Sequence, residues 1–146
     1  MNYQKRISGP LLDRIDIHIT VPRVDYEKLS DTRFGESSAA VRERVETARD
    51  MQRHRFLHHN ENSPKQPIFS NSDMHNAEIR EYCKLDEACN TLMRAAMKQY
   101  HLSARAYHRV LKLARTIADL AGADNIQEVH VNEAIQYRTL DRNLWV

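Results

Sequence analysis

The feature that most constrains this chain is the stretch of residues 101–122, which has the residue spacing of one amphipathic helix. Its apolar residues recur every three or four positions and would form one wide buried face. They are Ala104, Tyr107, Leu111, Ala114, Ala118 and Ala121, with Val110 and Ile117 beside them. Ser103 stands where an N-cap is expected, and Gly122 follows the last periodic residue as a C-terminal stop. The sequence therefore predicts a helix over residues 103–121 that packs against other elements.

The opposite face of this helix is predicted to be basic, and one of its cations is unusually placed. The basic residues are Arg105, Arg109, Lys112 and Arg115. Arg105 falls in the first turn, where the helix dipole favours acidic residues and makes a cation unfavourable by roughly a few tenths of a kcal/mol. A solvated surface arginine is the simplest interpretation. A cation at that end also suits an anion, because backbone N–H groups and a guanidinium can bind phosphate together.

The rest of the chain also favours helices, because glycine (3 residues) and proline (4 residues) are scarce. Apolar periodicity and capping residues predict helices over residues 39–57, 87–100 and 133–138, a short helix capped by residues 71–73 and running to about residue 82, and brief helical turns at 11–14 and 25–29. Residues 57–68 are predicted to be a loop, and residues 126–131 a short extended link. We expect a mainly α fold, a bundle of four to five helices.

One segment, residues 15–21, predicts a β-strand in front of the bundle. Its apolar residues alternate with polar ones until Pro22: Ile15, Ile17, Ile19 and Val21. A single strand with an apolar face needs a sheet, and this sequence supplies no other convincing strand. We expect its partners upstream, and without them a frayed or self-paired segment. The start at Met1–Asn2, followed at once by mid-element sequence, indicates a piece of a longer protein.

The sequence lacks the motifs of a self-contained enzyme. It contains no GxxxxGK[ST] phosphate loop, no acidic pair after an apolar strand that would hold magnesium, and no nucleophile–base arrangement. Cys83 and Cys89 have no Cys/His spacing that suits zinc, so we expect reduced structural thiols and predict no metal site. With no signal peptide or long apolar run, we expect a cytoplasmic protein without a membrane partner.

Contact with nucleic acid would have to come from local patches, because the net charge is only +2. The predicted helix over residues 39–57 carries more arginines than acidic residues: Arg42, Arg44, Arg49, Arg53 and Arg55. A solvated outer face with partial charge pairing is one interpretation of this helix. Contact with a nucleic-acid backbone is the alternative.

Three stretches of the sequence resemble one known family. RISGPLLDRIDIH, residues 6–18, resembles the end of the ATPase core in magnesium-chelatase-like AAA+ proteins. LSARAYHRVLKLARTIADL, residues 102–120, resembles the sensor-2 helix of their lid, and HVNEAIQYR, residues 130–138, resembles the closing helix of that lid. The nearest branch is the ComM/YifB type, a competence-associated group of DNA helicases. The resemblance implies that residues 15–21 are the last strand of a parallel ATPase sheet.

The resemblance also implies roles for two arginines, Arg14 and Arg105. Arg14, within LLDRID, would be the arginine finger that reaches in trans to the γ-phosphate held by the neighbouring subunit. Arg105 would be the sensor-2 arginine, which contacts the nucleotide of its own subunit in cis. Arg109, one turn later, is a second candidate for nucleotide contact, and an i,i+4 salt bridge explains it equally well.

Domain organisation and partners follow from the same resemblance. Residues 1–24 would be the C-terminal end of an AAA+ core, and residues 25–146 its helical lid domain. ATP and Mg would be bound by the full-length protein only, so the fragment alone would be inactive. The expected partners are its own upstream core, further copies in a ring expected to be a hexamer, and DNA that the ring remodels in competence and recombination.

Two alternatives remain open on the sequence alone. A chelatase-type subunit for metal insertion into a porphyrin shares the same motor and lid chemistry. A stand-alone helical DNA-binding module could use residues 103–121 as a recognition helix, although the low net charge and interspersed acidic residues argue against it.

Overall fold

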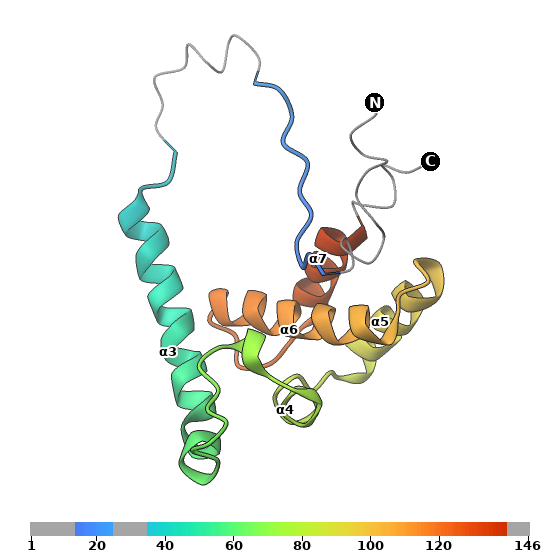
Figure 1. The fold of residues 1–146 in the computed structure, drawn as a ribbon. Coiled ribbons are helices and arrows are strands. Elements are labelled where there is room, and N and C mark those ends of the chain that lie inside the picture. Colours follow the sequence, from blue (N-terminus) through green and yellow to red (C-terminus); the bar gives the residue numbers. More distant parts are fainter. Residues whose placement is uncertain (1–13, 25–34, 140–146) are drawn as a thin grey trace.

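The computed structural model describes residues 14–24 and 35–139, and this part of the chain is mainly helical (Figure 1). Five α-helices and one short 3₁₀-helix follow in the order α3 (Ser38–Asn62), η2 (Asn71–Asp73), α4 (Asn76–Tyr82), α5 (Glu87–Gln99), α6 (Ala104–Leu120) and α7 (Glu128–Thr139). The prediction of a mainly α fold is therefore confirmed for the described residues. None of these helices is long and apolar enough to cross a membrane.

Helix α6 is the centre of the packing. It contacts α3, η2, α4 and α7, and α7 also packs on α5. Its predicted apolar face is buried, and Ala114 and Ala118 have no exposed surface. Around that face lie Phe56 from α3, Met93 from α5 and several other buried side chains that form one continuous core. The amphipathic stretch therefore organises the bundle in the way its spacing predicts.

The predicted start and stop of α6 are both confirmed. The Ser103 hydroxyl accepts a hydrogen bond from the backbone N–H of Ala106 at 3.2 Å. Gly122 has a backbone φ of +67°, the left-handed conformation in which glycine avoids the steric cost of a side chain. At the start of α5, Asp86 plays the same capping role, and the N–H of Cys89 donates to its carboxylate at 2.7 Å. That hydrogen bond lowers the pKa of Asp86.

Helix α3 is longer than predicted, and the predicted loop over residues 57–68 is wrong for its first part. The helix continues to Asn62, so only residues 63–68 of the predicted loop lie outside it. Asn60 explains the extension, because its side-chain amide clamps the returning chain: it donates to the Ile68 carbonyl and accepts from the Ile68 N–H, both at 2.8 Å. Ile68 is buried, so the loop folds back onto the last turns of the helix.

The last helix also begins earlier than predicted. Residues 128–131 lie in α7, although residues 126–131 were predicted to be extended. His130 stabilises this start, since its Nδ1 lies 3.1 Å from the Gln127 N–H and its own N–H donates to the Gln127 carbonyl at 3.0 Å. Val131 is fully buried, so the extra turn adds core contact. Between α3 and α5 the predicted single helix is divided into η2 and α4, with His75 as the N-cap of α4.

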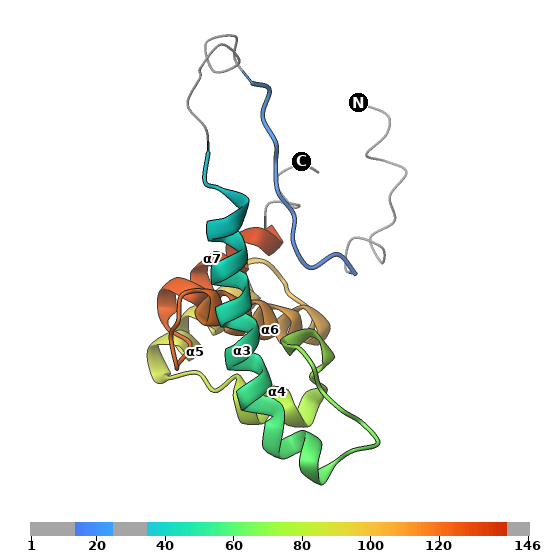
Figure 2. The ribbon, with the colours of Figure 1, turned by 90° about the vertical axis from the view of Figure 1, so that its left-hand side faces the viewer.

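The prediction of a strand over residues 15–21 is not confirmed, because the structure contains no strand in the described residues. The segment rises away from the bundle, as Figure 2 shows, and Ile19 and Val21 are 65% and 80% exposed. Among the described residues it has no second strand with which to form a ladder, and a lone strand leaves its backbone groups unpaired. The predicted turns at 11–14 and 25–29 lie outside the described residues, except for Arg14.

Candidate functional site

Arg105 is exposed in the first turn of α6. Within the described part of the chain it has no hydrogen-bond or ion-pair partner, and the first turn of α6 contains no acidic residue. The N-terminal end of a helix carries a partial positive charge, so a guanidinium at this position reinforces that charge instead of neutralising it. Arg105 therefore remains available to an anion that approaches the start of α6.

Arg109, one turn further along α6, is engaged with a residue far away in the sequence. Its Nη1 lies 2.7 Å from Oδ1 of Asp16. The side chain of Arg109 is 25% exposed and that of Asp16 is 61% exposed, so water screens the pair. A pair of this kind contributes about 0–1 kcal/mol to stability, and its main effect is to hold two segments together. The i,i+4 salt bridge considered for Arg109 is not its interaction in this structure.

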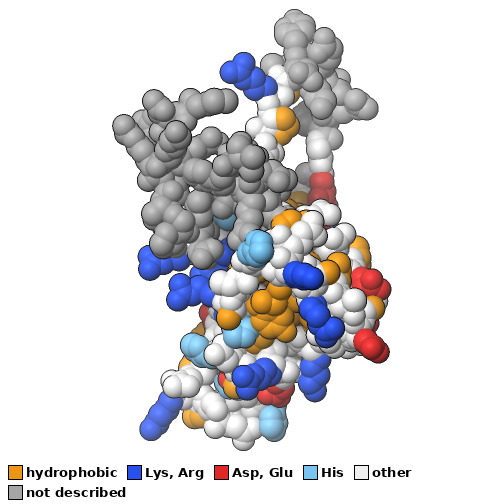
Figure 3. Space-filling model, turned by 90° about the vertical axis from the view of Figure 1, so that its right-hand side faces the viewer, with side chains coloured by type: hydrophobic (Ala, Val, Ile, Leu, Met, Phe, Trp, Pro, Cys, Tyr) orange, Lys and Arg blue, Asp and Glu red, His pale blue; other side chains and the backbone are white. Residues whose placement is uncertain are grey.

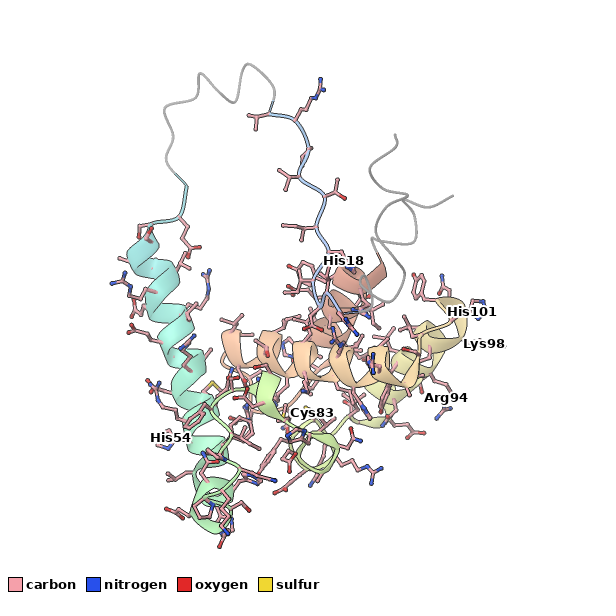
Figure 4. The ribbon with its side chains drawn as sticks, viewed as in Figure 1. His18, His54, Cys83, Arg94, Lys98 and His101 are labelled. Atoms are coloured by element: carbon pink, nitrogen blue, oxygen red, sulfur yellow. The ribbon has the colours of Figure 1, made fainter. Side chains whose placement is uncertain are left out.

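Arg14 is exposed and is the first described residue of the segment that contains Asp16. The residues that follow it are attached to α7: the Arg138 guanidinium donates to the Ile15 carbonyl, and the His18 N–H donates to the Tyr137 carbonyl at 2.9 Å. Figure 4 shows His18 at the point where the segment meets α7. The structure thus brings Arg109 to the segment of Arg14 through Asp16, and Arg105 lies one helical turn from that junction.

A small cleft of about 230 Å³ lies where these elements meet. Its wall includes Asp16, Arg109 and Lys112. Lys112 donates to the Ser72 carbonyl at 2.8 Å, so this second cation of the predicted basic face also has a partner. Figure 3 shows lysine and arginine side chains scattered over one side of the molecule, with acidic side chains among and beside them.

The prediction that Arg115 belongs to an exposed basic face is wrong. Arg115 is 2% exposed and donates through Nε to Asp119 at 3.1 Å. Its other nitrogens donate to the carbonyls of Asp124 at 2.8 Å and Ala123 at 2.6 Å. Burial lowers the pKa of Arg115, and the Asp119 carboxylate opposes that shift. The guanidinium therefore binds the end of α6 to the turn that follows it.

Asp119 is the centre of a buried polar network that joins three elements. Arg55 of α3 donates to both oxygens of its carboxylate, with Nη1 at 2.9 Å from Oδ2. Asn71 of η2 donates to Oδ2 at 2.8 Å and to the Thr116 hydroxyl at 3.1 Å. This network was not predicted from the sequence. The Arg115–Asp119 spacing of four residues was its one local signal, because both fall on the same face of a helix.

The other arginines of α3 are divided between paired and unpaired positions. Arg44 binds Glu36 through two hydrogen bonds of 2.7 and 3.1 Å, which lower the pKa of Glu36 and raise that of Arg44. Arg53 pairs with Asp50. Arg42 and Arg49 are exposed and have no described partner. Partial charge pairing, one of the two interpretations of this helix, is therefore present.

Neither cysteine has the features of a reactive or metal-binding thiol. Cys83 and Cys89 are free and buried in the core. Burial raises the pKa of each thiol to about 11. Across residues 14–24 and 35–139, no group of three or more His, Cys, Asp or Glu side chains is placed to hold a metal ion.

Comparison with known proteins identifies two family matches. Residues 35–138 match the family described as magnesium chelatase, subunit ChlI C-terminal. Residues 1–29 match the family described as magnesium chelatase, subunit ChlI.

Individual relatives resemble nearly the whole chain. It is 41% identical over 145 residues to the competence protein ComM of Haemophilus influenzae, and 39% identical over 145 residues to the uncharacterized protein YifB of Escherichia coli. In both comparisons the match covers 99% of this chain and 26% of the relative. An uncharacterized protein of Mycobacterium tuberculosis is 30% identical over 93% of this chain and 25% of its own length. The chain therefore spans about a quarter of the length of these relatives.

Proposed function

Because the chain belongs to the magnesium chelatase, subunit ChlI C-terminal family, we propose that it is the lid of an ATP-hydrolysing ring motor, together with the arginine-finger segment in front of that lid. The single observation that carries the proposal is the state of Arg105. It is an exposed cation at the positive end of α6, with no counter-charge among the described residues. A bound phosphate is the partner that such a position favours most.

Arg105 acts in cis in this proposal, on the nucleotide bound by its own subunit. Its guanidinium offers two parallel N–H donors to phosphate oxygens, and the start of α6 adds the helix dipole. As α6 is the packing centre of the bundle, a pull on its first turn is transmitted to α3 and α7, and through α7 to α5. Closure of the lid on ATP would then be a movement of the whole bundle.

Arg14 acts in trans, on the nucleotide of the neighbouring copy. Negative charge spreads over the phosphoryl oxygens during transfer, and a guanidinium from outside the binding pocket stabilises that charge. ATP and magnesium would be held by an upstream core, because this sequence has no phosphate loop and the described residues form no metal-binding cluster. We propose that copies assemble as a ring, a hexamer in the simplest case, in the cytoplasm.

We further propose that DNA is the substrate on which the ring acts, in remodelling or branch migration. The relative ComM is a competence protein by name, which supports a role of this chain in competence. Exposed Arg42 and Arg49 on the projecting half of α3 are compatible with a phosphate backbone nearby. Because the chain covers only 26% of that relative, activity and partners belong to the longer protein.

The test uses the protein that joins this chain to its upstream ATPase core. Arg14→Ala is expected to lower the ATP turnover number about 1000-fold or more, the usual effect of removing an arginine finger. Arg105→Ala is expected to weaken ATP binding. Arg94→Ala is the matched control, since Arg94 is an exposed arginine of α5 that Figure 4 shows pointing away from the bundle. Unchanged turnover in both Arg14→Ala and Arg105→Ala would contradict the proposal.

A chelatase subunit is the second candidate, and the match to the magnesium chelatase subunit ChlI families favours it. The same variants would lose ATP turnover in either case, because both machines use the same motor chemistry. Stimulation of turnover by DNA separates them. Turnover that rises with added branched or single-stranded DNA supports the motor on DNA, and indifference to DNA favours the chelatase.

A further inference from the structure

In the described part of the chain, three interactions are seen between residues 15–18 and the bundle, and they are not all of one kind. Two are made by α7 to backbone atoms: Arg138 to the Ile15 carbonyl, and the Tyr137 carbonyl to the His18 N–H. The third, Arg109 to Asp16, is the one made by α6 through two side chains. Only this third link depends on the identity of a residue within the LLDRID motif.

The geometry of α6 connects this link to the proposed nucleotide contact. Arg105 and Arg109 are four residues apart, so their side chains leave the same face of one rigid helix. Asp16 follows Arg14 by two residues, so a shift of the backbone at Asp16 also moves Arg14. The path from one arginine to the other consists of one helical turn, one ion pair and two residues of backbone.

We propose, resting on the function proposed above, that Arg109 and Asp16 are positioning residues that couple the cis nucleotide contact to the trans arginine finger. Arg105 pulls α6 toward the phosphates of its own subunit, and Arg109 moves with α6. Asp16, which is bound to Arg109, then shifts Arg14 toward the neighbouring subunit. Neither member of the pair touches nucleotide. This role differs from the direct nucleotide contact predicted for Arg109 from the sequence.

The exposure of the pair suits a link that breaks and re-forms. The Asp16 side chain is 61% exposed, whereas that of Asp119 in the buried network is fully buried. The two members of an exposed pair can separate and be solvated by water at little cost, whereas a buried carboxylate cannot lose its partners without a large one. Lys112 lines the same cleft and is held by Ser72, so a second cation stands beside Asp16 without competing for it in this structure.

The experiment is a double-mutant cycle on Asp16→Asn and Arg109→Gln in the protein that contains the upstream core. Each single variant is expected to lower turnover about two- to fivefold, because an exposed ion pair stabilises the aligned arrangement by no more than about that factor, with the ATP dissociation constant unchanged. The double variant is expected to lose no more than either single one, because both remove one link. Arg109→Lys is expected to recover part of the turnover. The exposed pair Arg53–Asp50, mutated in the same way, is the control.

Hydrogen exchange on the present chain gives an independent measurement of the link. Arg109→Gln is expected to speed amide exchange at His18 and its neighbours, and Arg53→Gln is not. Additive losses in the cycle, a weakened ATP dissociation constant in Arg109→Gln, or full turnover in both single variants would overturn the positioning role while Arg14→Ala remains inactive. Full turnover in Arg14→Ala would instead overturn the proposed function, and the positioning role with it, whatever the exchange rates show.

Discussion

The two ends of α6 use the same residue type for opposite purposes. Near the start, Arg105 is exposed and has no described partner. Nearer the end, Arg115 is 2% exposed, and its guanidinium binds Asp119 of the same helix and the carbonyls of the turn that follows it. In the sequence both belong to one apparent basic stripe. The comparison shows that the position of an arginine along a helix, and what folds over it, decide whether it holds the fold or remains available to a ligand.

The helix dipole accounts for part of this difference. The last turn of a helix exposes carbonyl oxygens and a partial negative charge, so a cation near that end is stabilised. Arg115 lies before the last turn of α6, and its guanidinium reaches the carbonyls of Ala123 and Asp124 beyond Gly122. Arg105 stands at the opposite end, where the dipole repels a cation. A residue kept in a locally unfavourable place indicates a role outside the stability of the bundle.

Among substitutions near the C-terminal end of α6, Asp119→Ala is expected to have the largest effect on the free energy of unfolding. The substitution leaves Arg55 and Arg115 without their carboxylate, and Asn71 loses a hydrogen bond. Removal of one partner from a buried charge network costs about 3–5 kcal/mol, since the remaining charges are buried without compensation. Urea unfolding followed by circular dichroism measures the change.

Asp50→Ala is the matched control for this variant. Asp50 also pairs with an arginine, Arg53, but both side chains are about 60% exposed. Its removal is expected to change the free energy of unfolding by no more than about 0.5 kcal/mol. A loss in Asp119→Ala as small as that in Asp50→Ala would mean that the network does not hold α3 and η2 to α6.

The helices of the central bundle could be predicted closely where capping and periodicity agree. Ser103 and Gly122 delimit α6 within one residue of its observed ends, and the predicted start of α5 at residue 87 is the observed one. The prediction failed where the deciding partner is distant. Asn60 extends α3 by clamping Ile68, and residues 15–21 form no strand in the absence of a second one.

The candidate site could be predicted only in part, for a similar reason. Spacing places Arg105 and Arg109 on one face of a helix, but it cannot reveal that Asp16 lies against Arg109 from 93 residues away. Nor can periodicity show that the turn after Gly122 covers Arg115. Both contacts depend on where a loop returns, and residue spacing within one helix carries no information about that.

Gly122→Ala is expected to have the next largest effect. A side chain at a φ of +67° costs about 1–2 kcal/mol, although there is nothing within 4 Å for a Cβ atom to strike. Gly35→Ala is the matched control, because Gly35 also has open space around it but its φ lies outside the left-handed region. The changes in the free energy of unfolding of the two variants, measured by thermal and urea unfolding, should differ in sign or by at least about 1 kcal/mol. Equal effects would show that the end of α6 does not depend on this backbone conformation.

A smaller effect is expected from Ser103→Ala at the start of α6. Loss of an N-cap costs about 1 kcal/mol when the helix is part of the cooperative core. Ser37→Ala removes the corresponding cap of α3, where the N–H of Ala40 donates to the hydroxyl at the same distance of 3.2 Å. The first turns of α3 project beyond the bundle (Figure 1) and are exposed, so their fraying should leave the global unfolding free energy almost unchanged. A larger loss in Ser37→Ala would contradict this difference between the two helices.

The smallest effect, and the one that tests the comparison most directly, is that of Arg105→Ala. Removal of a first-turn cation relieves an unfavourable interaction with the helix dipole, so the free energy of unfolding should rise by about 0.3 kcal/mol or stay the same. Arg115→Ala, in the same helix, should lower it by several times the usual error of the measurement, because it leaves Asp119 without one of its partners. Chemical unfolding of both variants under identical buffer conditions gives the two signs. If Arg105→Ala were to destabilise the chain by more than about 1 kcal/mol, this arginine would be a structural residue like Arg115, and its availability to phosphate would no longer follow.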